Sequence, residues 1–82
     1  MQTNDLKKGD RVILRNGWYA TIMDNKKGNT RFCDVEGFER ELGSVYSHDI
    51  VAVVKPGGQV RIAHTPAQEK LRRTVFNWYR HD

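Results

Sequence analysis

Two alternating apolar runs on either side of an Asn-Gly pair are the first pattern along the chain. Positions 10–15 and 18–23 alternate in the way β-strands do, with Val12 and Leu14 on one face. Asn16-Gly17 between them is the strongest short hairpin signal, because both central residues of a type I′ turn need a positive φ. The pattern predicts a β-hairpin, and in so short a chain that hairpin indicates a small barrel.

Further strand signals follow at regular spacing. Thr30 to Val35 resumes the alternation, and the stretch 36–43 is interpreted as a short strand, with a helical turn as the alternative. Ile50 to Val54 is a continuous apolar run rich in β-branched residues, which is typical of a strand covered on both faces. Pro56-Gly57-Gly58 predicts a turn before a last strand at 59–63. Six such signals at this spacing favour a barrel.

The C-terminal segment changes to a helical period. Thr65, Pro66 and Gln68 form the pattern of an N-cap, a first-turn proline and a capping box. We expect the helix to dock on the strand 50–54 through an apolar stripe. The residues of that stripe are Ala67, Leu71, Val75 and Trp78.

The predicted fold is mainly β: a small antiparallel barrel of five or six short strands over 6–63, with an α-helix over 65–80, in a single domain of 1–82. The segments LKKGDRVILRNG and YSHDIVAVV resemble SH3-like and KOW-like small barrels, in which a Gly-Asp opens the first strand. The chain is also similar to uncharacterised small proteins of bacteriophage genomes. The resemblance implies the SH3-like barrel fold and no particular function.

Composition narrows the class of protein. With 82 residues and 38% hydrophobic residues, the chain has little apolar surface beyond one small core, so we expect no enzyme and no cofactor. The single Cys33 has no partner for a disulfide or a zinc site, which favours a reducing compartment. We find no signal peptide or membrane-spanning run and expect a cytoplasmic monomer, in the host cytoplasm if the gene is a phage gene.

A net charge of +4 favours an anionic partner. One face of the predicted helix carries a stripe that suits phosphate or carboxylate contacts. Its residues are Lys70, Arg73, Asn77 and Arg80. The alternative is an ordinary solvated helix face, in which Glu69 pairs with Arg73 one turn on.

A second group combines basic and aromatic residues in the first half of the chain. Exposed rings beside such charges are platforms on which nucleic-acid bases stack. The alternative is that the rings cover the mouth of the barrel. The candidate residues are Lys26, Lys27, Arg31, Arg15, Trp18 and Tyr19.

The sequence offers few residue patterns that suggest catalysis or metal binding. A pair of Cys33 with His48 or His64 has no orienting motif around it, so a half-buried structural cysteine and surface histidines are the preferred interpretation. The histidines have no second ligand at metal spacing. Ser47 or Asp49 is expected to hold the turn before residue 50 by bonding backbone amides, which leaves His48 exposed at the barrel rim.

The resulting hypothesis is a small non-enzymatic binding module, a phage-type accessory protein whose partner is an acidic surface of a host protein. Sequence-nonspecific nucleic-acid binding by the basic helix face is the first alternative. A structural component of a larger assembly is the second.

Overall fold

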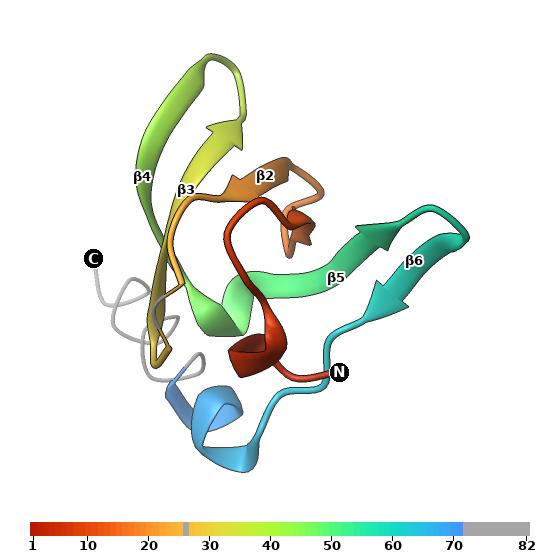
Figure 1. Cartoon of the computed structure of the whole chain (residues 1–82). Coiled ribbons are helices and arrows are strands. Elements are labelled where there is room, and N and C mark those ends of the chain that lie inside the picture. Colours follow the sequence, from red (N-terminus) through yellow and green to blue (C-terminus); the bar gives the residue numbers. More distant parts are fainter. Residues whose placement is uncertain (26, 72–82) are drawn as a thin grey trace.

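The computed structural model describes residues 1–25 and 27–71. These residues form one mainly β domain with two 3₁₀ turns and a short helical segment at 66–71 (Figure 1). The 3₁₀ turns are η1 (Thr3–Asp5) and η2 (Ser47–Asp49). The strands are β1 (Arg11–Leu14), β2 (Tyr19–Ile22), β3 (Thr30–Glu36), β4 (Arg40–Tyr46), β5 (Ile50–Lys55) and β6 (Gly58–Arg61).

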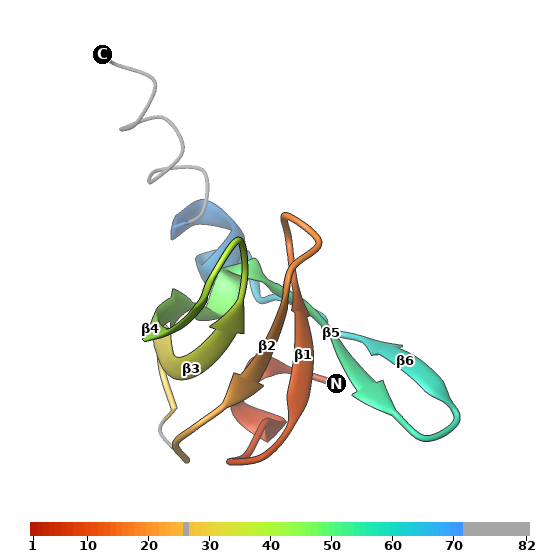
Figure 2. The same cartoon turned by 90° about the horizontal axis from the view of Figure 1, so that it is seen from above.

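All of these strands belong to one antiparallel sheet in the order β4-β3-β2-β1-β5-β6. The sheet is open, so β4 and β6 are its edges. Figure 2 shows the β5–β6 hairpin projecting away from the β3–β4 hairpin, with β1 and β2 between them. The mainly β prediction is confirmed, and the described strands stop short of a closed ring.

The first hairpin forms as predicted but with a different turn. The N–H of Gly17 donates to the carbonyl of Leu14 at 2.9 Å, and the N–H of Leu14 donates to the carbonyl of Trp18 at 2.7 Å. Gly17 has a φ of 91°, whereas Asn16 does not adopt a positive φ, so the type I′ prediction is wrong. Asn16 instead accepts the N–H of Trp18 through Oδ1 at 3.0 Å, and the longer loop needs glycine only at its last position.

Strand alternation places the core on the inner face of the curved sheet. Val12, Ala20 and Cys33 are fully buried on three neighbouring strands, and η1 leads into Leu6 beneath them. Burial of this apolar surface is the main stabilising term in so small a domain. The core residues are Leu6, Val12, Leu14, Ala20, Ile22, Cys33, Ile50, Val53 and Ile62.

The ambiguous stretch 36–43 divides between two elements. β3 extends to Glu36, residues 37–39 make the bend, and β4 begins at Arg40. The strand interpretation is therefore confirmed for 40–43. The bend leaves Phe38 97% exposed at the tip of the hairpin.

The helix begins with the predicted capping box. The N–H of Gln68 donates to Oγ1 of Thr65 at 3.2 Å, and the N–H of Thr65 donates to Oε1 of Gln68 at 2.9 Å. Ala67, predicted to dock, is exposed, whereas Gln68 bonds Thr3 of η1 and Glu69 contacts Arg15 and His64. Leu71 is half-buried. The stripe positions Val75 and Trp78 lie outside the described residues.

No helix within 1–25 and 27–71 is both long and apolar enough to cross a membrane.

Candidate functional site

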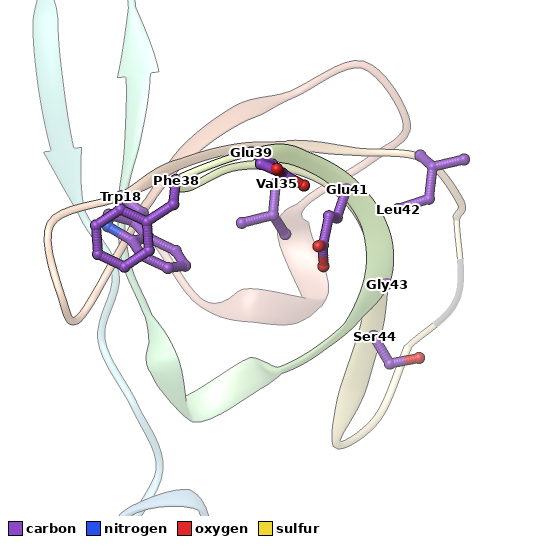
Figure 3. A pocket seen from close by; sticks show the side chains of 8 residues that line it. All are labelled: Trp18, Val35, Phe38, Glu39, Glu41, Leu42, Gly43 and Ser44. Atoms are coloured by element: carbon purple, nitrogen blue, oxygen red, sulfur yellow. The ribbon is translucent and has the colours of Figure 1, made fainter.

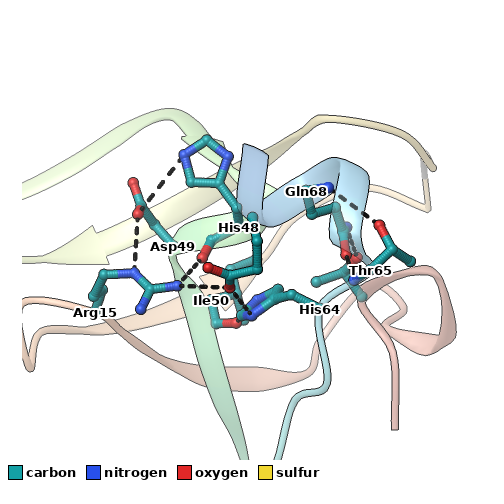
Figure 4. Close-up of polar contacts among 9 residues, drawn as sticks. Arg15, His48, Asp49, Ile50, His64, Thr65 and Gln68 are labelled. Carbon is teal, nitrogen blue, oxygen red and sulfur yellow. Dashed lines mark hydrogen bonds and ion pairs between the residues drawn. The ribbon is translucent and has the colours of Figure 1, made fainter. Parts of the chain in front are cut away.

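Arg15 is exposed and takes part in a polar network (Figure 4). Its Nε lies 3.5 Å from Oδ1 of Asp49, and its Nη2 donates to the carbonyl of His48. The same guanidinium lies 3.9 Å from Oε1 of Glu69, which also contacts Nδ1 of His64 at 3.5 Å. Arg15 thus joins the first hairpin to η2 and the helix, and its place in a basic binding patch stays a prediction.

Arg31, in contrast, does not belong to an exposed basic patch, because it is 1% exposed. Strand alternation turns its side chain inward, where the guanidinium finds carbonyl acceptors rather than solvent. Nη1 donates to the carbonyls of Gly28 and Thr30, and Nη2 donates to the carbonyl of Thr3 and to Oδ1 of Asn4. Burial lowers the pKa of Arg31 from its ordinary value. Its role is to hold the N-terminal segment on the sheet.

Only some of the other predicted basic residues lie within the part of the chain that the structure describes. Lys27 and Lys70 are exposed, as expected. Lys26, Arg73, Asn77 and Arg80 lie outside the described residues, so the basic helix stripe stays a prediction.

Trp18 and Tyr19 point to opposite faces of the sheet, because neighbouring residues alternate along a strand. Tyr19 lies on the outer face under the guanidinium of Arg11, 4.6 Å from the ring centre, and is 39% exposed. Trp18 lies at the inner end of the hairpin against Phe38 and is 37% exposed. The two rings therefore do not form one stacking platform, although each retains partial exposure.

Cys33 and His48 do not present a nucleophile to solvent. Cys33 is fully buried, and burial raises the pKa of its thiol to about 11, which leaves little thiolate at neutral pH. His48 is 2% exposed and stacks on Tyr46 with ring centres 5.0 Å apart. The expected exposed position of His48 at a rim is wrong, since η2 folds it inward. In the described residues no three His, Cys, Asp or Glu side chains gather in a way that suits a metal ion.

The β3–β4 hairpin carries a surface that the sequence interpretation missed. We call Phe32, Leu42 and Tyr46 the outer apolar patch; they are 40%, 62% and 41% exposed. Phe32 pairs across the strands with Ser44, so Leu42 and Tyr46 are its diagonal neighbours on the same face. Asp34, opposite Leu42, accepts two hydrogen bonds from Arg40, which lower the pKa of the Asp34 carboxyl. The ion pair between Asp34 and Arg40 thus borders the outer apolar patch beside Leu42.

The opposite face of the same hairpin encloses a groove of about 430 Å³. Figure 3 shows Val35 and Glu41 pointing into the curl of β4, with Trp18 and Phe38 at one end and Leu42 directed away. The lining residues are Trp18, Val35, Phe38, Glu39, Glu41, Leu42, Gly43 and Ser44. The stretch 36–43 gave no strand alternation that could signal the groove, because its large apolar residues Phe38 and Leu42 are separated by three charged residues. The helix-or-strand ambiguity there also obscured which face each residue takes.

Comparison of the chain with protein-family models, with curated proteins and with solved structures found no match.

Proposed function

We propose that this chain is a small non-enzymatic binding module that engages a protein partner through β4 and the outer apolar patch. The observation that carries the proposal is the exposure of Leu42 on an edge strand, flanked by Phe32 and Tyr46. An edge strand offers unpaired backbone donors and acceptors, and natural proteins usually protect such an edge with charges, proline or a covering element. β4 is seven residues long and carries charges only at Arg40 and Glu41; Leu42 and Tyr46 stand exposed on its outer face, which suits addition of a partner strand.

The fold that we propose for this module is a small barrel of the SH3-like type. The curl of β4 around the groove (Figure 3) and the six antiparallel strands of one sheet support that architecture. The resemblance to uncharacterised bacteriophage proteins supports a host protein as the partner. A net charge of +4 supports an acidic region on that partner, and Lys27, Lys70 and the residues beyond 71 are the positions that would meet it.

Partner capture tests this proposal. The tagged protein is used to recover binders from a nuclease-treated bacterial lysate, beside Leu42→Ser and the matched control Val60→Ser. Val60 is 40% exposed on β6, the other edge. We expect wild type and Val60→Ser to recover the same discrete protein and Leu42→Ser to lose most of it, because deleting an apolar anchor at an interface removes much of its binding free energy.

Three outcomes contradict the proposal. Capture that disappears after nuclease treatment assigns the surface to nucleic acid. Recovery undiminished in Leu42→Ser places the interface elsewhere. A size-exclusion mass that rises with concentration in wild type and falls to the monomer in Leu42→Ser assigns β4 to a second copy, as in a structural component of an assembly.

A further inference from the structure

The groove on the inner face of the hairpin has an aromatic end. The rings of Trp18 and Phe38 meet edge to face, with centroids 5.4 Å apart and planes at 79°. Gly37 makes this possible, since a Cβ at that position would lie 2.6 Å from the indole of Trp18. The indole of Trp18 is thereby held at the groove with more than a third of its surface exposed.

The carboxylates of Glu39 and Glu41 line the same groove as these rings, and Figure 3 shows Glu41 on the side of the groove away from Trp18. Within the described part of the chain, the side chains of Glu39 and Glu41 form no hydrogen bond or ion pair, and both are exposed. Asp34 and Glu36, on the outer face of the same hairpin, each pair with an arginine side chain. The groove is therefore an acidic site with an aromatic wall in a chain whose net charge is +4.

We propose that this groove binds an arginine side chain of the partner, an inference that rests on the function proposed above. A guanidinium group is planar and weakly hydrated, stacks on an aromatic ring and donates to carboxylates in a fixed fork. The indole of Trp18 and the carboxylates of Glu39 and Glu41 offer those two kinds of contact. The volume of the groove is within the range of small-ligand sites.

The position of the groove also defines the form of the partner segment. β4 separates the groove on its inner face from the outer apolar patch on its outer face, and it is a sheet edge. Successive residues of a strand added to β4 would point to alternate faces. The segment therefore carries an arginine on the inner face and apolar neighbours, one residue away on each side, on the outer face.

A synthetic peptide tests this assignment without any cellular partner. The probe is acetyl-Thr-Val-Arg-Val-Thr-amide, and the same peptide with neutral citrulline in place of arginine is its control. Titration is followed by two-dimensional NMR at the indole N–H of Trp18, assigned with a Trp78→Phe variant. We expect the arginine peptide to shift this signal, and binding to weaken about fivefold or more in Glu39→Gln/Glu41→Gln, since two exposed charge contacts are lost.

Two further variants decide the mechanism. Glu36→Gln removes one negative charge from the outer face of the hairpin and should leave the affinity unchanged. Gly37→Ala leaves the charge intact but displaces the indole, and should weaken binding. Equal binding of the citrulline peptide, or equal weakening by Glu36→Gln, overturns the arginine assignment. If the peptide does not bind while cellular capture still depends on Leu42, the arginine assignment is wrong and the binding module stands.

Discussion

The buried guanidinium of Arg31 shows how one residue sets the position of a distant segment. It donates to the carbonyl of Thr3 and the side chain of Asn4, which lie far from β3 in sequence. Hydrogen bonds that satisfy a buried charged group are strong, and their loss leaves carbonyls buried without donors. Arg31 is therefore a link between η1 and the sheet.

The first prediction concerns this link. Arg31→Ala should lower the free energy of unfolding by about 3 kcal/mol, because a buried charge-assisted network is broken and a cavity remains. Chemical denaturation measures the change. The matched control is Arg61→Ala on the exposed strand β6, which should alter stability by no more than about 0.5 kcal/mol. Similar losses in both variants would show that the contacts of Arg31 add little.

Among the elements, the helix start is held both locally and by the N-terminal turn. Thr65 and Gln68 satisfy each other's backbone N–H groups. The amide nitrogen of Gln68 also donates to Oγ1 of Thr3 at 2.7 Å. The Gln68 side chain thus caps the helix (Figure 4) and attaches it to η1 through Thr3.

The second prediction separates these two roles. Thr65→Ala removes the cap and should cost about 1 kcal/mol of unfolding free energy. Gln68→Glu keeps an acceptor for the N–H of Thr65 but has no N–H to donate to Thr3, so it should be destabilising in wild type and nearly neutral in a Thr3→Val background. A double-mutant cycle by denaturant titration measures this coupling. Equal effects of Gln68→Glu in both backgrounds would show that the hydrogen bond between Gln68 and Thr3 does not stabilise the attachment of the helix to η1.

For the whole molecule, Cys33 reports on the integrity of the core. It is the single cysteine of the chain and lies fully buried on β3, paired with β2 and β4 on either side. Its thiol becomes accessible only when the sheet opens, because Cys33 packs in one core with residues of β1, β2 and β5.

The third prediction is that Ellman's reagent labels native Cys33 very slowly at mildly alkaline pH and stoichiometrically in denaturant. The folded-state pKa of about 11 lies above the ordinary value of 9.0. The stabilisation from this protonated thiol is therefore complete below the ordinary value and is lost as the pH rises through the folded-state value. Labelling rates should follow global unfolding across a denaturant series. Rapid labelling without denaturant would show that β3 opens on its own.

Prediction from the sequence succeeded where neighbouring residues decide the outcome. The alternation at 10–15 and 18–23 placed two strands, and Thr65 with Gln68 placed a helix start, because strand period and capping depend on residues a few positions apart. The same reasoning did not anticipate the turn after Leu14, since Asn16 bonds the N–H of Trp18 in place of adopting a positive φ.

The sequence by itself determined a mainly β domain, its first hairpin and its helix start. Only the tertiary structure decided which charges are free: Arg31 turns inward, Arg15 meets Asp49 and Glu69, and Glu39 and Glu41 stay unpaired among the described residues. The physical reason is that strand period assigns a face to each residue, whereas the strand order and the curl of the sheet decide whether that face meets the core, another charge or solvent.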